Sequence, residues 1–372
     1  MNTDLFLKML QIDSTSGKEG ELAAFLESSL TTASCKVERF PVESMIGDCP
    51  EVCPQPCNLL FSWGTPKVVF CTHLDTVPPY IYPSSGEGPA IYGRGTCDAK
   101  GQIFAMYEAC IRLEAKGYTD FALLLLAGEE TGSFGAKAFD SLPHKSFATE
   151  DAVLVVGEPT DNHMASAAKG TKSFEVEFEG EAFHSGYPQH GRSAVLMFNE
   201  FLNALRSIGF PQDPVLGETT WNIGKLRSDN PQNILSDKLV CRVYFRTTFE
   251  SDEMVCNVMK NMAGPDAKLR FGRPKAQDGS DIVAKDVAEW QRYMKVTAFG
   301  GDEPTRFETF DGFPSKPVAF GSDAPQLKCF RRKILCGPGS ILTAHRDNEH
   351  IDLHDLEIAV QNYINIYKLV VE

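Results

Sequence analysis

The sequence of 372 residues lacks a hydrophobic run long enough to cross a membrane. Its longest apolar run, Phe121 to Gly128, is far shorter than the ~20 residues that a transmembrane helix needs. The first residues, Met1 to Asp4, also lack the basic start and the continuous apolar core of a signal peptide. We therefore expect a soluble, cytoplasmic protein with no membrane partner.

Positive charge is also scarce. Lysine and arginine number 36 against 50 aspartate and glutamate residues, so the net charge is 36 − 50 = −14. An acidic surface repels nucleic-acid phosphates and anionic lipids. This balance argues against a nucleic-acid partner, and equally against a metal-dependent nuclease or phosphatase.

The 11 cysteines are too few for a disulfide scaffold in a chain of this length, and their number is odd. We expect thiols in a reducing compartment. Cys49, Cys53 and Cys57 lie among prolines, but their spacing of three intervening residues differs from the C-x2-C knuckle of zinc sites. A Pro-rich surface loop that carries thiols is the better interpretation.

Short, almost wholly apolar runs indicate strands that are covered on both faces. These runs are Val68–Cys71, Phe121–Ala127, Ala152–Val156 and Pro317–Phe320. They are separated by helical patterns, among them two N-terminal helices, the second after a capping box at 16–19, and a crossover helix from Ile103 to Ala115. The pattern predicts an α/β fold with a helix-flanked, mostly parallel sheet.

The middle of the chain has a different pattern. Residues 174–179 and 239–246 alternate between apolar and polar, which is typical of a sheet with one wet face. An amphipathic helix, Ala194–Ile208, lies between them. We predict an α+β domain over 171–276, inserted into a catalytic domain of 1–170 plus 277–372, with a helix from Asp281 to Thr297 leading back.

Acidic residues and one histidine follow the predicted buried strands. His73 and Asp75 follow the first, Glu129 and Glu130 the second, and Glu158 the third. Because ligands bind beyond the carboxyl ends of such strands, we expect these side chains to converge.

Asp98 lies in the loop between the first two strands and adds a fifth carboxylate. Carboxylates that converge without a counter-ion repel one another, and a bound cation resolves the conflict. A histidine with several carboxylates suits zinc, or manganese or cobalt, rather than calcium. Asp75, two residues from His73 on an extended strand, is placed to steady its imidazole.

A dinucleotide site is a weaker interpretation of the same loop. Gly93 and Gly95 begin a G-x-G pattern, but Asp98 stands at the third glycine position, where it would repel a pyrophosphate. The sequence also has no P-loop, no G-x-S-x-G elbow and no H-E-x-x-H helix.

Several motifs resemble the dizinc deacylase and exopeptidase family that includes acetylornithine deacetylase, succinyl-diaminopimelate desuccinylase, aminoacylase and carboxypeptidase G. The motifs occur in the family's order along the whole chain. The motif at 93–101 and the last two favour the acetylornithine deacetylase branch. They are HLDTVP at 73–78, GRGTCDAKG at 93–101, EET at 129–131, GEPT at 157–160, GSDAP at 321–325 and GPGS with AH at 337–345.

The resemblance implies two divalent metal ions, zinc in most relatives. One ion would be bound by His73, Asp98 and Glu158, and the other by Asp98, Glu130 and His345, with Asp98 shared. Glu129 would be the general base that deprotonates the attacking water and later protonates the leaving amine.

The resemblance also implies a homodimer, with the inserted domain as a ferredoxin-like dimerisation and lid domain. His184 would reach across the dimer to stabilise the oxyanion. Asn233 and Arg246 match positions that hold the substrate's carboxylate, although Arg246 shares the phase of Arg242 and is equally interpreted as a solvent-facing strand residue.

The leading hypothesis is a deacylase of N-acyl amino acids that converts acetylornithine to ornithine and acetate in arginine biosynthesis. The same chemistry on acetylcitrulline, succinyl-diaminopimelate, acetyl-lysine or a dipeptide is the close alternative. A non-catalytic, peptide-binding relative is the third, and the presence of Glu129 with a complete ligand set argues against it.

Overall fold

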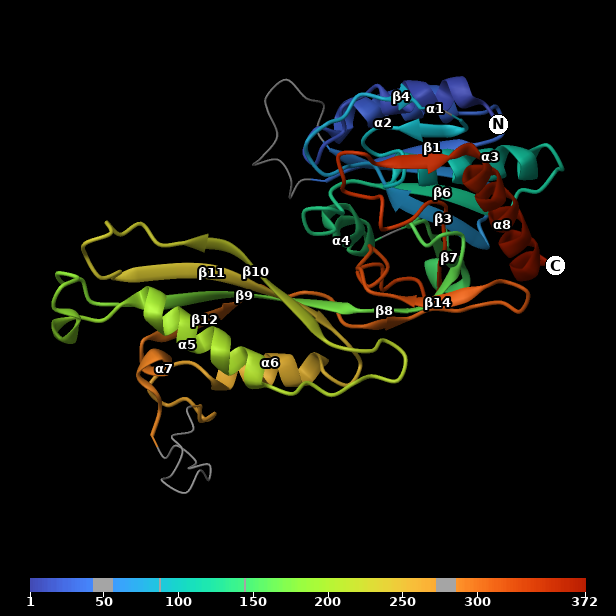
Figure 1. Ribbon diagram of the computed structural model, residues 1–372. Helices are drawn as coiled ribbons and strands as arrows, with labels where there is room; N and C mark the ends of the chain where they lie inside the picture. Colours follow the sequence, from blue (N-terminus) through green and yellow to red (C-terminus); the bar gives the residue numbers. More distant parts are fainter. Residues whose placement is uncertain (43–55, 87, 144, 272–285) are drawn as a thin grey trace. The chain divides into compact units, whose positions relative to one another are not determined.

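The computed structural model describes residues 1–42, 56–86, 88–143, 145–271 and 286–372 (Figure 1). The chain forms two compact units. Unit 1 contains residues 1–166, 306–318 and 322–372, and unit 2 contains 167–305 and 319–321. Cys49 and Cys53 of the predicted Pro-rich loop lie outside the described residues. The prediction was wrong for Cys57, which is buried at the start of strand β2 (Cys57–Trp63). The nine cysteines that are described are all free thiols.

Unit 1 is built on a six-stranded sheet in the order β1-β2-β6-β3-β7-β15. Strands β6, β3, β7 and β15 are parallel, and β2 pairs antiparallel with both β1 and β6. The strands are β1 (Lys36–Pro41), β2 (Cys57–Trp63), β3 (Val68–His73), β6 (Phe121–Leu126), β7 (Val153–Val156) and β15 (Arg332–Leu335).

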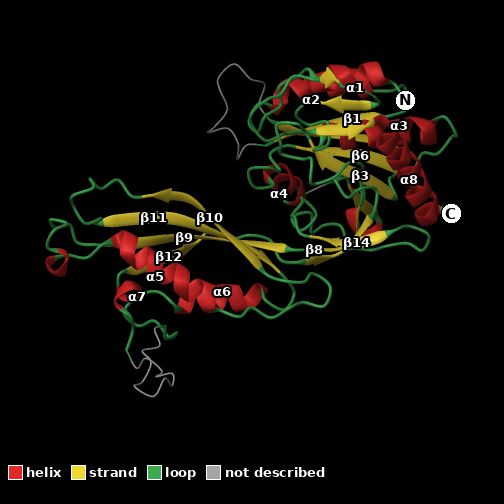
Figure 2. Ribbon diagram, viewed as in Figure 1, coloured by secondary structure: helices red, strands yellow, loops and turns green. Residues whose placement is uncertain are grey.

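Helices cover this sheet, as Figure 2 shows by the red ribbons around the yellow strands. They are α1 (Thr3–Leu10), α2 (Glu19–Leu30), α3 (Lys100–Glu114), α4 (Phe134–Asp140) and α8 (Leu353–Val371), with a 3-10 turn at Thr149–Asp151. Alternate strand residues such as Phe70 and Leu123 share one core with α1, α2, α3 and α8. Their neighbours Cys71 and Leu124 are equally buried, so the predicted helix-flanked, mostly parallel sheet is confirmed.

The described residues also form two small sheets of three strands each. One has the order β13-β8-β14, from β8 (Met164–Ala168), β13 (Thr305–Arg306) and β14 (Ser315–Val318). The prediction that 317–320 is a buried strand of the main sheet was therefore wrong. The edge position belongs to β15, which pairs with β7.

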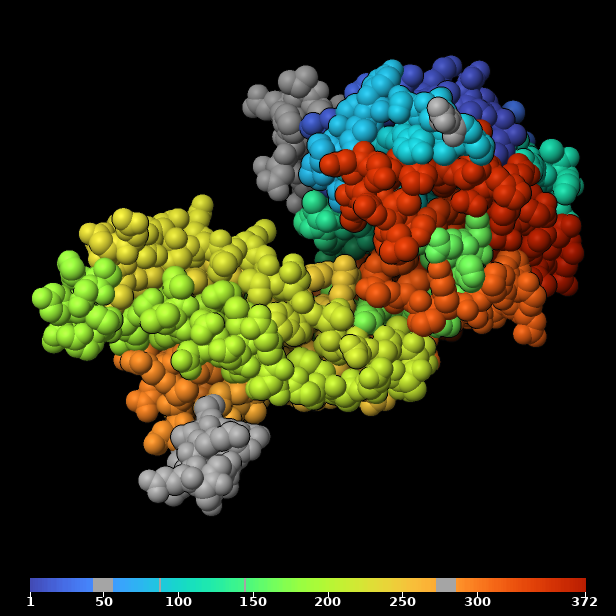
Figure 3. Space-filling model, viewed as in Figure 1, coloured from blue at the N-terminus to red at the C-terminus, as the bar shows by residue number. Residues whose placement is uncertain are grey.

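The other small sheet, β16-β5-β4, joins β4 (Ser84–Ser85), β5 (Ala90–Tyr92) and β16 (His350–Asp352). Since β16 pairs with β5, the C-terminal segment lies beside the segment near residue 90. Figure 3 shows this as red surface against cyan surface.

Unit 2 is a four-stranded antiparallel sheet in the order β10-β11-β9-β12, packed against α5 and α6. Its elements are β9 (Gly170–Glu179), α5 (Ala194–Ser207), β10 (Thr220–Arg227), β11 (Lys238–Thr247), α6 (Asp252–Asn261), α7 (Glu289–Arg292) and β12 (Met294–Ala298), with a 3-10 turn at Pro188–His190. The alternating residues Phe174, Val176 and Phe178 are buried. Both predicted alternating strands and the predicted amphipathic helix are thus present.

The predicted helix from Asp281 to Thr297 is wrong over its described part. Residues 289–292 form only the single turn α7, and 294–298 form strand β12, which pairs with β9 and makes unit 2 longer than the predicted 171–276. Met294 packs in the core of unit 2, so tertiary burial decided this segment.

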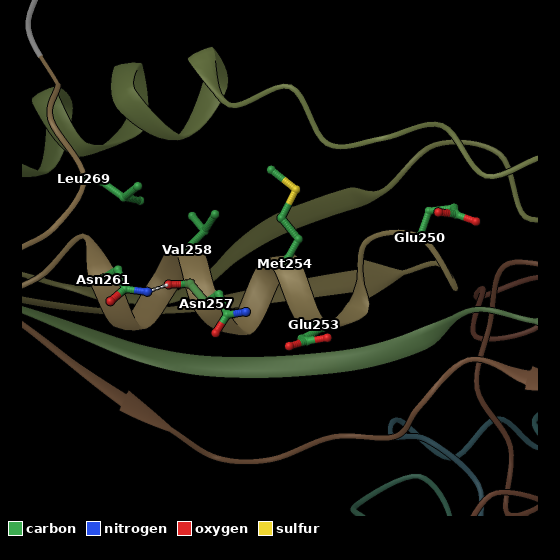
Figure 4. Close-up of a pocket in the computed structure, with 7 residues that line it drawn as sticks. All are labelled: Glu250, Glu253, Met254, Asn257, Val258, Asn261 and Leu269. Carbon is green, nitrogen blue, oxygen red and sulfur yellow. Dashed lines mark hydrogen bonds between the residues drawn. The ribbon is translucent and has the colours of Figure 1, made fainter. Parts of the chain in front are cut away.

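A pocket of about 380 Å³ lies along α6 in unit 2. Figure 4 shows Met254 and Val258 projecting from one side of the helix and Glu253 from the other. Its lining contains no histidine or cysteine. In the described part of the chain, no helix is both long enough and apolar enough to cross a membrane.

Candidate metal centre

The parallel strands β3, β6 and β7 bring three chain segments to one edge of the main sheet. His73 is the last residue of β3, Glu129 and Glu130 follow β6, and Glu158 follows β7. His73 and Glu158 are only 2% and 4% exposed. The expectation from the strand ends is met: these side chains do converge.

Asp98 and His345 reach the same place from loops. Asp98 precedes α3, and His345 lies between β15 and β16. Asp98 Oδ1 is 2.9 Å from His73 Nε2, while Asp98 Oδ2 is 3.3 Å from His345 Nε2. Asp98 therefore stands between two imidazoles, with one oxygen facing each. His345 Nε2 is also 2.9 Å from Glu130 Oε1.

The donor atoms are close enough together to hold ions. Three overlapping groups each have their donor atoms within 4.8 Å of one another: His73 with Asp98 and Glu158, Asp98 with Glu130 and His345, and His73 with Glu129 and Glu130. Three nitrogen and carboxylate donors per ion is the usual set of a catalytic zinc site. The first two groups share Asp98, so the residues fit a pair of divalent ions. The third shows that Glu129 is also within reach of a ligand position.

The charges of the centre also suit cations. Desolvation of the carboxylate, with nearby Asp98 and Asp323, raises the pKa of Glu158 well above its usual range. Desolvation raises the pKa of Glu129 in the same way. Hydrogen bonds with Asp98 and Glu130 raise the pKa of His345 to about 10. Carboxylates that repel one another, and imidazoles whose pKa values rise beside them, are typical of a site that binds positive charge.

Asp75 does more than the sequence predicted. His73 Nδ1 is 3.0 Å from the Asp75 carbonyl oxygen and 3.4 Å from Asp75 Oδ1, which fits the predicted role beside the imidazole. The same carboxylate also accepts hydrogen bonds from the backbone N–H groups of Glu129 (3.0 Å) and Glu130 (3.1 Å). Glu129 and Glu130 lie in a turn closed by the Gly132 N–H bonding to the Glu129 carbonyl. They are therefore not on an extended strand that would separate them.

Ser16 is a contributor that sequence reasoning missed. Its hydroxyl donates to Asp75 Oδ2 at 2.8 Å, and its backbone N–H bonds to the Thr76 carbonyl. The predicted capping box at 16–19 is thus wrong, since Glu19 accepts from the Gly17 N–H instead. The pattern itself carried no signal for the contact with Asp75, 59 residues away.

Asp323 and Glu349 were also not assigned to the centre. Asp323 is 2% exposed and adds to the raised pKa of both Glu129 and Glu158. Glu349 is 1% exposed and contacts the backbone of Asp98. A buried carboxylate is rare unless it is paired or functional, but burial is not visible in the sequence.

Unit 2 holds the remaining predicted site residues. His184 and Asn233 are exposed and lie in paired loops: His184 forms a β-bridge with Ile234, and the Ser185 N–H donates to the Asn233 carbonyl at 2.9 Å. The structure thus brings these two predicted residues together.

Arg246 lies at the other end of the same sheet. It pairs with Thr171 at the start of β9, whereas the loop of His184 follows Glu179 at its end. Glu179 lies eight positions after Thr171 in β9, which is roughly 26 Å at ~3.3 Å per residue. Among the described residues, no carboxylate pairs with the Arg246 guanidinium. Burial and, more weakly, Arg246 itself lower the pKa of the nearby Lys169.

Comparison with known proteins places the chain in a family. The model of peptidase family M20/M25/M40 matches residues 69–368. A protein of Aspergillus terreus named probable carboxypeptidase is 31% identical over 387 aligned positions, which cover 95% of this chain and 83% of that protein.

Solved structures share the fold. A tripeptidase from Staphylococcus aureus has a TM-score of 0.75 at 19% identity, covering 99% of this chain and 97% of that one. A dinuclear metal-binding peptidase from Bacillus subtilis has a TM-score of 0.66 at 11% identity, with 99% and 97% covered. The family model spans most of the chain, so this protein is a hydrolase of amide bonds and belongs to peptidase family M20/M25/M40.

Proposed function

We propose that the protein is a dinuclear-metal amidohydrolase that removes the acyl group from an N-acyl amino acid. Acetylornithine is the proposed preferred substrate. The observation that carries the proposal is the sharing of Asp98 between two groups of three ligands, with Glu129 beside both. His73, Asp98 and Glu158 would hold one ion, and Asp98, Glu130 and His345 the other. Zinc is the first choice, with cobalt or manganese as alternatives.

Two bound ions would polarise the amide carbonyl and lower the pKa of the attacking water. Glu129 takes the proton of that water as its oxygen attacks the carbonyl carbon. When the C–N bond breaks, Glu129 returns the proton to the leaving amine. Desolvation raises the pKa of Glu129, which makes its ionised carboxylate a stronger proton acceptor.

A homodimer is part of the proposal, with His184 of the partner subunit stabilising the oxyanion. Its support is the arrangement within unit 2. His184 and Asn233 stand at one end of the sheet and Arg246 at the other, too far apart to contact one small substrate within a single copy. Two copies could supply them to one site, with Arg246 and Asn233 holding the substrate's carboxylate.

A second candidate keeps the chemistry and changes the substrate to a dipeptide or the C-terminal residue of a short peptide. It is favoured by the name probable carboxypeptidase of the relative from Aspergillus terreus. Acetylcitrulline, succinyl-diaminopimelate and acetyl-lysine share the same linear amide and free carboxylate. The cytoplasmic location and a role in arginine biosynthesis remain predictions.

The test is amine release from a panel of these compounds, measured with metal-free protein and after addition of zinc or cobalt. We expect metal-dependent cleavage, fastest for acetylornithine. Faster cleavage of dipeptides than of acetylornithine would show that the protein is an exopeptidase rather than a deacylase. Absence of turnover with two ions bound would favour a non-catalytic, peptide-binding relative.

A further inference from the structure

A buried ion pair contacts the backbone of Asp98. Arg94 Nη1 is 2.6 Å from Glu349 Oε2, and the two side chains are 1% and 0% exposed. Burying two charges costs several kcal/mol per ion unless further hydrogen bonds satisfy them. The other hydrogen bonds of the two side chains therefore show which part of the structure this ion pair holds in place.

The other hydrogen bonds of the Glu349 carboxylate are made with the loop that carries Asp98. Oε1 accepts hydrogen bonds from the backbone N–H groups of Cys97 at 3.0 Å and of Asp98 at 3.1 Å. The backbone carbonyl of Glu349 accepts from the Gly93 N–H at 2.9 Å. Arg94 on Oε2 and two amides on Oε1 take three of the roughly four acceptor positions of the carboxylate. Glu349 belongs to none of the candidate ligand groups of the described residues.

Arg94 extends the connection to the loop of His345. Its guanidinium donates to the carbonyl of Arg346, the residue after His345, at 3.3 Å, and to the carbonyl of Pro79 at 3.1 Å. One ion pair thus joins the backbone on either side of the contact between Asp98 and His345.

We propose that Glu349, held by Arg94, is a positioning residue that fixes the Asp98 carboxylate between the two metal sites. The inference rests on the proposed metal centre. Since Asp98 would serve both ions, a shift of its backbone would change both sites together. Asp75 provides a parallel in the same molecule, because it holds the amides of Glu129 and Glu130.

The decisive variant is Glu349→Asp. It keeps the negative charge opposite Arg94 but withdraws the carboxylate by one methylene from the amides of Cys97 and Asp98. The matched control is Glu357→Asp, which shortens the partner of Arg112 in another Arg–Glu pair of unit 1, at 2.5 Å and about half exposed. For each protein, Co²⁺ affinities are measured by calorimetry, the coordination geometry by visible absorption of bound Co²⁺, and folding by thermal melting.

We expect wild-type protein and Glu357→Asp to bind two ions alike. In folded Glu349→Asp, both affinities should fall by roughly 10- to 100-fold, the usual effect of removing a group that orients a ligand, and the Co²⁺ spectrum should change. A folded Glu349→Asp with wild-type affinities and spectrum would overturn the inference while leaving the metal centre intact. Failure of the wild-type protein to bind metal would overturn the proposed function, and this inference with it.

Hydrogen exchange on the metal-free wild-type protein decides the matter if the variant does not fold. Slow exchange at the amides of Cys97 and Asp98 is expected, since Glu349 rather than metal holds them. Fast exchange at both amides would contradict the inference.

Discussion

At the residue scale, two buried carboxylates perform the same task at different places. Asp75 and Glu349 each accept hydrogen bonds from two consecutive amides beside the candidate ligands. A carboxylate can hold two neighbouring N–H groups at once because its lone pairs accept several bonds. The acidic residues of the centre thus divide into candidate metal ligands and residues that hold the backbone of those candidates.

Glu129→Gln tests whether Glu129 is the general base or a metal ligand. As the general base it should lose about 10³-fold or more in kcat, while two metal ions per chain are retained. The reason is that the amide cannot take a proton from water but keeps the side chain's size. Amine release and elemental analysis of the bound metal measure both effects.

Loss of one ion would instead make Glu129 a ligand, in agreement with its closeness to His73 and Glu130. Glu150→Gln is the matched control, because it removes an exposed carboxylate that pairs with Arg331. That variant should keep full activity and both ions.

Glu19 makes the stability of the folded protein depend on pH between about 4.5 and about 8. Its side chain is fully buried, and desolvation together with nearby Asp75 raises its pKa from 4.5 to about 8. The folded state then binds a proton that the unfolded state has released between these two values. Stability should therefore fall as pH rises from about 4.5 to about 8, by about 1 kcal/mol per pH unit from this group.

Glu19→Gln should remove this part of the pH dependence, since glutamine cannot ionise. Denaturation curves at pH 6 and pH 9 would show a smaller loss of stability in the variant than in wild-type protein. Glu21→Gln, at an exposed position of the same helix, should leave the wild-type slope. Equal slopes in all three proteins would show that Glu19 does not titrate in this range.

At the scale of elements, continuous apolar runs predicted β3, β6 and β7, and alternation predicted β9 and β11. Strand β15 was missed because its sequence, Arg-Lys-Ile-Leu, is half charged. Only its last two residues are buried, and its pairing with β7 supplies the rest of its stability. Short strands of this kind are determined by their neighbours rather than by their own pattern.

The segment after β15 packs tightly against the residues around Glu158 and Gln102. A Cβ at Gly337 would lie 2.1 Å from Gln102 Oε1 and 2.6 Å from the backbone oxygen of Glu158. The side chain of Gln102 is itself held by the carbonyls of Cys97 and Pro338. The crowded atoms therefore have little room to move.

Gly337→Ala should lower the free energy of unfolding by about 1–3 kcal/mol through overpacking, and it should weaken metal binding because Glu158 is displaced. Gly224→Ala is the control, since a Cβ there meets no atom within 4 Å. Chemical denaturation and metal titration measure the two effects. Equal free energies of unfolding for both variants would show that the loop at Gly337 accommodates the added methyl group without loss of stability.

At the scale of the whole molecule, the proposed dimer predicts complementation between two inactive variants. His184→Ala should lose about 10²–10³-fold in kcat if it stabilises the oxyanion, with metal content unchanged. When it is unfolded, mixed with Glu129→Gln and refolded, roughly one quarter of wild-type activity should return. Half of the dimers are then mixed, and each of those has one intact site of two.

Mixtures that stay inactive, although native mass spectrometry of one isotope-labelled variant with one unlabelled variant shows mixed dimers, would place His184 and Glu129 of the same copy in one site. His190→Ala, at another exposed histidine of the same loop, is the control and should remain active by itself.

The sequence by itself determined the fold class, the strands with long apolar runs and the residues that end them. These features are local: periodicity and composition express which face of a segment is buried. The motifs in their order along the chain also indicated the family before any comparison, because they carry chemistry in short stretches.

The tertiary structure alone decided how those residues meet. The placement of Asp98 between two imidazoles depends on contacts between Glu349 and Cys97, 252 residues apart, and on the pairing of β16 with β5. The contact of Ser16 with Asp75 is of the same kind. No periodic pattern encodes such contacts, because they arise from the packing of segments that the sequence separates.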